Sequence, residues 1–128
     1  MAPNIKTIPT SEYQVVKKTV QRYVEGAKAG SPSRTVEPFH RDATMYGYYK
    51  GELTAGPIKN LYNYIEKFGS SPDMNTHLDV LAITPTTAVV KVEMEGEATG
   101  TPYTDFHTLI KLDGIWTIIA KVFHAYDV

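Results

Sequence analysis

Apolar side chains recur every three or four positions in the first third of the chain, which is the spacing of one face of an α-helix. Thr10 or Ser11 can cap the start of this helix, and Gly30 is a typical stop. The pattern predicts a helix over residues 10–30, preceded by a loose arm at residues 1–9. The apolar stripe consists of Tyr13, Val16, Val20, Tyr23, Val24 and Ala27.

Two further helices follow from local signals. Ser31-Pro32 is a cap with proline at the first helical position, and Pro38 should end the short helix that it opens. Gly56-Pro57 precedes a third helix, which Gly69 ends. The face of this third helix that we expect to be buried carries Ile58, Leu61, Tyr62, Ile65 and Phe68.

The remaining segments have the composition of strands. An aromatic stretch at residues 44–53 turns near Lys50-Gly51 and predicts a short strand pair before the third helix. Four strands in succession are expected at residues 76–84, 88–98, 103–112 and 115–126. Helices and strands are therefore segregated, which favours an α+β fold with one sheet and helices on one of its faces. We see no linker, so residues 1–128 are expected to form a single domain.

The last two strands meet at Asp113-Gly114, a strong signal for a two-residue hairpin loop. If the loop contains only these two residues, the register follows by counting. The expected partners are His107 with Ala120, Asp105 with Val122, and Tyr103 with His124. Cross-strand partners share a face, so this register predicts that Asp105, His107 and His124 lie with Trp116 toward the helices. It places Lys121 on the opposite face.

A carboxylate on the helix side of this hairpin requires an explanation. Desolvating it alone costs several kcal/mol, so it needs a partner or a raised pKa. Asp105 and His107 are two residues apart on one strand and are therefore neighbours. An Asp–His pair in an apolar pocket is equipped for general acid–base catalysis, although the same pair also serves as a structural hydrogen bond. Both interpretations stay open at this stage.

Both faces of the hairpin are largely apolar. One layer of helices covers only one face of a sheet, and the other would be an exposed apolar patch of several hundred Å². We therefore expect a homodimer that forms through the sheet.

Composition excludes several classes of function. The 128 residues carry a net charge of −1, which gives no reason to expect a nucleic-acid partner. There is no cysteine, so disulfides and thiolate chemistry are excluded, and a reducing, cytoplasmic location is expected. No segment approaches the ~18 apolar residues of a membrane span, and no secretion signal is recognisable, so we expect no membrane partner. The nine tyrosines are suited to pocket walls, since each combines an apolar ring with a polar tip.

A metal site could in principle draw on His40, Asp105, His107 and His124. None of these pairs has the i, i+4 spacing of a zinc-binding helix. We therefore expect neither a metal nor another cofactor.

Four segments of the sequence resemble the NTF2-like superfamily, and within it the SnoaL-like group described as "Putative lumazine-binding". They are Tyr23-Val24-Glu25-Gly26, FHRDA (39–43), GELTAG (51–56) and TDFHTLIKLDGIWTIIAKVFH (104–124). The last motif is long and specific, and His107 stands in it where relatives usually have a hydrophobic residue. The resemblance implies three helices wrapped over a curved antiparallel or mixed sheet, with a cone-shaped interior cavity.

Enzymes of this superfamily move a proton next to a carbonyl without a cofactor. The resemblance implies Asp105 and His124 as the catalytic acid–base pair of an isomerase, dehydratase or cyclase. Residues expected to contact a small apolar or aromatic ligand are Tyr23, His40, Tyr46, Tyr48, Tyr103, His107 and Trp116. Because fold does not decide function, two alternatives remain: a non-catalytic module that binds a ligand in the cavity, and a dimerisation domain.

Overall fold

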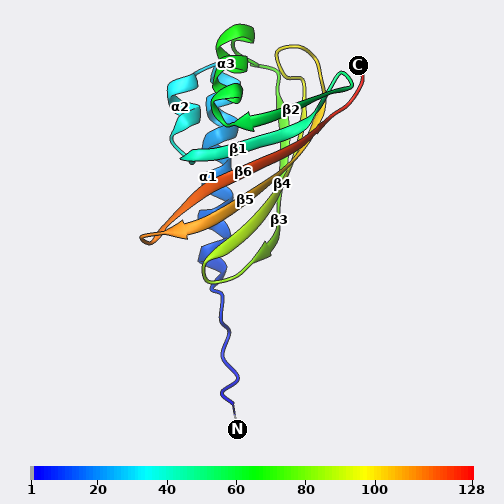
Figure 1. The fold of residues 1–128 in the computed structure, drawn as a ribbon. Helices are drawn as coiled ribbons and strands as arrows, with labels where there is room; N and C mark the ends of the chain where they lie inside the picture. The colour runs from blue at the N-terminus through cyan, green and yellow to red at the C-terminus, as the bar shows by residue number, and fades with distance from the viewer. Residues whose placement is uncertain (1) are drawn as a thin grey trace.

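The helices and strands occur in the order that the sequence pattern predicts, although the first strand begins at Phe39 and not at residue 44, and the second ends at Pro57 and not at residue 53. A computed structural model describes residues 2–128 (Figure 1). Its helices are α1 (Thr10–Ala29), α2 (Pro32–Val36) and α3 (Lys59–Phe68). Its strands are β1 (Phe39–Tyr49), β2 (Glu52–Pro57), β3 (Asn75–Ile83), β4 (Thr87–Glu95), β5 (Tyr103–Leu112) and β6 (Ile115–Ala125).

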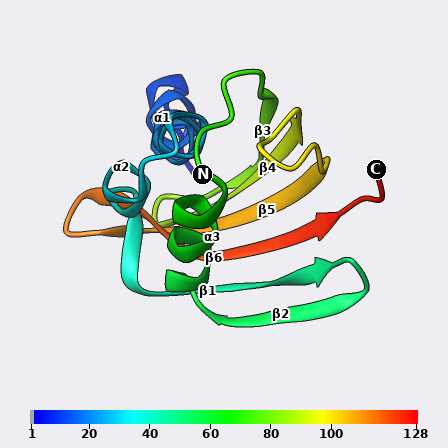
Figure 2. The same ribbon diagram turned by 90° about the horizontal axis from the view of Figure 1, so that it is seen from above.

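The strands form one mixed sheet in the order β2-β1-β6-β5-β4-β3. Strand β1 runs parallel to β6, and every other neighbouring pair is antiparallel. Figure 2 shows the sheet curving around the three helices, which all lie on one face. The α+β fold predicted from the sequence is confirmed.

Local sequence explains where the helices begin and end. Gly30 adopts a left-handed conformation with φ of 66° and closes α1. Its N–H donates to the Ala27 carbonyl at 3.1 Å, and the Ser31 N–H donates to the Gly26 carbonyl at 2.9 Å. Ser31 caps α2, because its hydroxyl accepts a hydrogen bond from the Arg34 N–H at 3.3 Å. The expected cap at Thr10 or Ser11 is wrong: Pro9 occupies the N-cap position of α1 without a side-chain hydrogen bond. Pro9 has fixed φ, and its carbonyl accepts a hydrogen bond from the Glu12 N–H at 3.1 Å, so the helix starts with a backbone contact in place of a side-chain cap.

The β5–β6 hairpin departs from simple counting. Asp113 and Gly114 both have positive φ, at 49° and 79°, so the two-residue loop is confirmed. Pairing follows the expected register from Leu112–Ile115 to Leu109–Ile118, and then a β-bulge leaves Ile119 without a partner. An extra residue in one strand shifts every later pair by one position.

The bulge reverses which side chains of β6 face the helices. Lys121 lies opposite His107, and Phe123 lies opposite Asp105. The prediction that Lys121 faces outward is therefore wrong, and so is the prediction that His124 faces the helices. The physical reason is that a one-residue shift exchanges the two faces of a strand.

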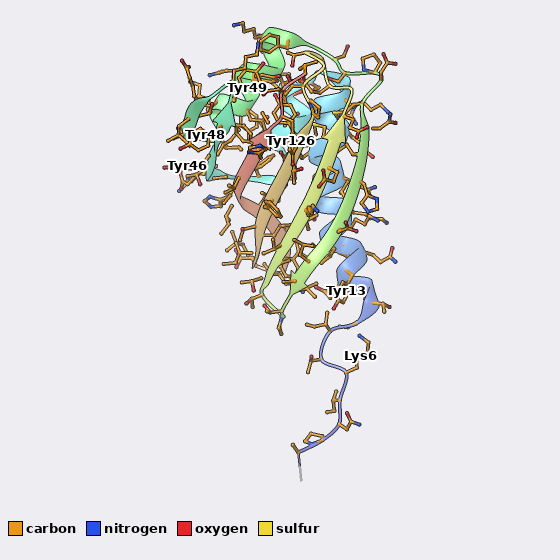
Figure 3. The ribbon with its side chains drawn as sticks, turned by 90° about the vertical axis from the view of Figure 1, so that its right-hand side faces the viewer. Lys6, Tyr13, Tyr46, Tyr48, Tyr49 and Tyr126 are labelled. Carbon is orange, nitrogen blue, oxygen red and sulfur yellow. The ribbon has the colours of Figure 1, made fainter. Side chains whose placement is uncertain are left out.

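The sheet face away from the helices is partly apolar. Large side chains with substantial exposure on this face are Tyr46, Tyr48, Leu53, Phe106 and Val122. Figure 3 shows Tyr46 and Tyr48 on the side of the sheet away from α1. Among the described residues, no helix combines the length and apolar character needed to cross a bilayer.

Candidate functional site

A cavity of about 120 Å³ lies between α3 and the strands β1, β2, β5 and β6. Apolar side chains form most of its wall, and the polar groups are three tyrosines, an amide, a threonine and one lysine. Several of the lining residues are partly exposed, so the cavity opens beside β2 and α3. Its lining consists of Met45, Tyr49, Thr54, Asn60, Leu61, Tyr64, Tyr103, Lys121 and Phe123.

Lys121 is the charged residue in this wall, and it is only 4% exposed. The bulge at Ile119 turns its side chain inward. Its Nζ lies 4.4 Å from the centre of the Phe123 ring and 3.8 Å from the Met45 Sδ. A lysine is almost never buried this deeply unless a counter-charge accompanies it.

Asp105 provides that counter-charge from the neighbouring strand β5. Its Oδ2 lies 3.8 Å from Lys121 Nζ and accepts a hydrogen bond from the Tyr23 hydroxyl at 3.4 Å. The side chain is 1% exposed, and Oδ1 has no hydrogen-bond partner among residues 2–128. Asp105 is absent from the cavity lining, so it lies behind Lys121 as seen from the cavity.

His107 continues this buried cluster. Its Nε2 lies 3.5 Å from Asp105 Oδ2, and neither ring nitrogen has a hydrogen-bond partner within the described part of the chain. The ring packs against Tyr23 and Phe39, with ring centres 5.1 and 6.1 Å away. The expected Asp105–His107 proximity is confirmed. However, His107 is fully buried and does not line the cavity.

Burial and charge together set the protonation of the cluster. Burial would raise the pKa of Asp105, but the charge of Lys121 and the neighbouring His107 outweigh it and hold this pKa below its ordinary value. Burial lowers the pKa of the Lys121 amine, and the Asp105 charge opposes this only in part. Burial also lowers the pKa of His107. The cluster therefore favours an ionised carboxylate and a neutral imidazole, beside an amine that loses its proton more readily than an ordinary lysine.

A second polar group reaches the cavity from α3 and β5. The Tyr64 hydroxyl lies 2.9 Å from Glu97 Oε2 and 3.0 Å from the Tyr103 hydroxyl. Glu97 is buried, and its Oε1 accepts hydrogen bonds from the backbone N–H groups of Thr99 and Thr101. Because an ionised carboxylate only accepts, Tyr64 donates to Glu97 and Tyr103 donates to Tyr64. The Tyr103 oxygen then remains available as an acceptor.

The predicted site residues fall into two groups. On the helix side, Tyr103 lines the cavity, and Tyr23 contacts Asp105 outside the lining. Trp116 is buried away from the cavity, and its Nε1–H donates to Glu12 Oε2 at 2.9 Å. The second group lies outside the cavity as well. His40 is partly exposed in an irregular part of β1, and its Nδ1 accepts from the Asp42 N–H.

Tyr46, Tyr48 and His124 form the group that contradicts the predicted site. All three are exposed and point to the sheet face opposite the helices. Alternation along β1 sends Met45 and Tyr49 inward, so Tyr46 and Tyr48 must point outward. The ring of His124 packs instead on Tyr126, with ring centres 4.7 Å apart.

Sequence reasoning missed Lys121, Tyr49 and Tyr64. For Tyr64 a signal was available, because it lies three residues after Leu61 on α3 and thus near its inward face. For Lys121 the hint was the run Ile118-Ile119-Ala120, where regular alternation of apolar and polar residues stops. Such a run is compatible with a bulge but does not locate it.

The cavity wall contains a side-chain type that carbonyl chemistry uses. A lysine with a lowered pKa in an apolar wall can exchange a proton with a substrate or attack a carbonyl carbon. Within residues 2–128, no group of three or more histidine, aspartate and glutamate side chains is arranged to hold a metal ion. That the site works without a metal or another cofactor stays a prediction.

Comparisons with known proteins agree with this fold. The family described as "Putative lumazine-binding" matches residues 11–124. A protein of Cladobotryum sp. named "Aldolase FrzH" is 45% identical over 121 residues, which cover 94% of this chain and 97% of that protein.

Two crystal structures of NTF2-like proteins of unknown function are also similar. The protein from Shewanella baltica OS155 has a TM-score of 0.88 and 28% identity, covering 96% of this chain and 100% of that one. The protein from Methylobacillus flagellatus KT has a TM-score of 0.88 and 31% identity, covering 94% of this chain and 96% of that one.

Proposed function

Because the chain belongs to the "Putative lumazine-binding" family of the NTF2-like superfamily, we propose that it is an enzyme for aldol-type chemistry on a small carbonyl compound. In the forward direction a proton is removed from the carbon beside the carbonyl, and the resulting carbanion forms a carbon–carbon bond to a second carbonyl. In the reverse direction a β-hydroxyl loses its proton, and cleavage of the carbon–carbon bond releases the same carbanion. The name of the relative that is 45% identical supports this reaction class.

The observation that carries the proposal is the position of Lys121. Its amine lies in the wall of an apolar cavity, with the Asp105 carboxylate 3.8 Å behind it. This arrangement lets Lys121 interact with a substrate carbonyl or its neighbouring proton, while Asp105 balances the charge. Asp105 thus acts as a positioning residue, and no role is assigned to His124.

The cavity limits the substrate. A volume of about 120 Å³ is close to the ~150 Å³ of an apolar cavity that holds benzene. We infer a ketone or aldehyde with a small apolar or aromatic body as the group that enters the cavity. The Tyr103 oxygen can accept a hydrogen bond from a hydroxyl on such a compound.

Proton exchange in heavy water tests the proposed function without knowledge of the natural substrate. Acetone, cyclohexanone and acetophenone are incubated with the protein in D₂O, and loss of the signal from hydrogens beside the carbonyl is followed by NMR. We expect the protein to accelerate exchange over buffer for at least one probe, by about 10²-fold, a typical contribution of general acid–base catalysis. Lys121→Met should abolish the acceleration.

The matched control is Lys111→Met. Lys111 is also partly buried and pairs with Glu12 at 3.1 Å, but it does not line the cavity. This variant should exchange protons as the unmodified protein does. If a probe shifts the NMR signals of cavity residues yet exchanges no faster than in buffer, the enzyme proposal fails and a ligand-binding module replaces it.

We also propose a homodimer that forms through the outer face of the sheet. Tyr46, Val122 and Phe106 are cross-strand neighbours and make an exposed apolar row across β1, β6 and β5. Beyond this row, the ion pair Lys91–Glu93 carries both signs of charge. A second copy of this face can therefore approach without net repulsion.

The change Phe106→Lys tests this interface. A charge in the centre of an apolar interface costs several kcal/mol on burial, so we expect a variant that is monomeric where the unmodified protein is dimeric, as measured by analytical ultracentrifugation. The control Val15→Lys changes an exposed apolar residue on α1 and should leave the dimer intact. A monomeric unmodified protein over the whole concentration range would contradict the proposal.

A further inference from the structure

The environment of Lys121 differs from that of an ordinary ion-paired lysine. Its distance of 3.8 Å from Asp105 Oδ2 exceeds the length of a hydrogen bond. Its contact with the Met45 Sδ, also at 3.8 Å, is a weak one. No oxygen of residues 2–128 accepts a hydrogen bond from its amine, although the amine has three N–H groups when protonated.

The groups around this amine leave one direction open. The Phe123 ring centre lies 4.4 Å from Nζ and the Tyr23 ring centre 5.9 Å away. Asp105 lies 3.8 Å from Nζ and outside the cavity lining, whereas Lys121 belongs to that lining, so we infer that the remaining direction faces the cavity. An amine held in this way can approach a molecule in the cavity without first breaking a strong hydrogen bond.

We propose that Lys121 is a nucleophile that forms a covalent imine with the carbonyl carbon of the substrate. This inference rests on the proposed function and deepens it, because it names the bond that activates the carbonyl compound. It also narrows the substrate to an aldehyde or an unhindered ketone, since the amine must reach the carbonyl carbon inside a cavity of about 120 Å³.

The covalent step conserves atoms and protons. The nitrogen lone pair of the neutral amine forms a bond to the carbonyl carbon as the C=O π bond breaks, and one proton moves from the nitrogen to the oxygen to give a carbinolamine. The oxygen takes a second proton from solvent and leaves as water, and the nitrogen keeps one proton in a positively charged imine. This nitrogen withdraws electrons from the neighbouring carbon, which releases a proton to solvent and becomes the nucleophile of an aldol reaction. The ionised Asp105 stabilises the positive nitrogen, and hydrolysis returns the free amine.

The site favours the neutral amine that this step requires. Burial lowers the pKa of Lys121, and desolvated lysines of this kind form imines in other enzymes. The Asp105 charge acts in the opposite direction and keeps the amine partly protonated. The titratable groups that face Lys121 or share its cavity are Tyr23 from α1, Tyr49 from β1, Tyr64 from α3, and Tyr103, Asp105 and His107 from β5.

Acetylacetone is a direct probe of a neutral amine in a small apolar cavity. One of its carbonyls condenses with the amine, one water is lost, and the product relaxes to a conjugated enaminone that absorbs in the near ultraviolet. At neutral pH an exposed lysine is protonated and reacts poorly, because its pKa is about 10.4. The full-length protein is incubated with acetylacetone, and near-ultraviolet absorption and the mass of each peptide are measured.

We expect one enaminone per chain, with the added mass on the peptide that contains Lys121. Its formation should rise with pH and reach half its maximum below the ordinary lysine pKa of 10.5. Lys121→Arg keeps a charge beside Asp105 but cannot form the adduct. The control Lys111→Arg should react as the unmodified protein does. Because the peptide mass is measured on the unmodified protein, the test does not depend on folding of the variants.

The two proposals fail in different ways. If the protein accelerates proton exchange but forms no enaminone, or forms it equally on exposed lysines, Lys121 acts without a covalent bond and this inference is overturned. If the enaminone forms on Lys121 but no probe exchanges protons, the nucleophile is supported and the proposed reaction class fails.

Discussion

Replacing Asp105 with asparagine is expected to lower the free energy of unfolding by about 3 kcal/mol, because removal of one partner from a buried ion pair leaves the other charge uncompensated. Asp105 and Lys121 are 1% and 4% exposed, so water cannot substitute for the lost partner. Urea unfolding followed by circular dichroism measures the change. The control Asp79→Asn removes an exposed carboxylate and should change stability by less than about 0.5 kcal/mol.

The double variant Asp105→Asn/Lys121→Met tests whether the loss of stability comes from leaving Lys121 without its counter-charge. If the loss in Asp105→Asn comes from an unpaired lysine, the double variant should recover most of it, since replacing both members of a buried pair is often nearly neutral. A double variant that is as unstable as the sum of the two single variants would show that each side chain contributes independently.

The pH dependence of stability follows from the same pair. The pKa of Lys121 is lowered in the folded protein, so between that pKa and its ordinary value of 10.5 the unfolded chain binds more protons. The contribution of Lys121 to stability therefore rises with pH across this window, and Lys121→Met should lack this contribution. The pKa of Asp105 is also lowered, so its contribution is present above its ordinary value of 3.8 and is lost as pH falls through its folded pKa.

Gly47→Ala is expected to destabilise the protein by about 3 kcal/mol, because no space exists for a methyl group at this position. A Cβ on Gly47 would lie 2.3 Å from the backbone oxygen of Phe123 and 2.6 Å from its ring. Since the nearest atom belongs to the backbone of the paired strand β6, rotation of a side chain cannot relieve the clash. Strands β1 and β6 would have to separate beside the cavity.

Gly51→Ala is the matched control. Gly51 has φ of 80°, but a methyl group on its Cα would have no other atom within 4 Å, so alanine there should cost only the backbone strain of about 1 kcal/mol. Thermal or urea unfolding of both variants measures the difference. Equal losses in the two variants would mean that the close approach of Gly47 to Phe123 does not limit stability.

Local chemistry was enough to locate every helix and strand. The helical stripe from Val16 to Val24, the stop at Gly30 and the Asp113-Gly114 loop each depend on residues that are close in sequence. The burial of Asp105 and His107 on one face of β5 could also be predicted, because alternation within one strand needs no information from its neighbour.

The composition of the site could not be predicted in the same way. The site depends on Ile119, which has no partner in the β5–β6 ladder. It also depends on an irregular segment of β1 between Phe39 and Thr44, which lies across from the same part of β6. These irregularities arise where three strands are fitted together and curved around the helices, so they are properties of the sheet and not of one segment.

From residue order alone, the α+β fold, the order of its elements and a buried carboxylate were determined, because propensity, turn geometry and alternation act over a few residues. Only the tertiary structure decided that Lys121, and not His124, stands beside Asp105. The physical reason is that side chains alternate strictly along a strand, so one unpaired residue exchanges the interior and exterior of everything that follows it.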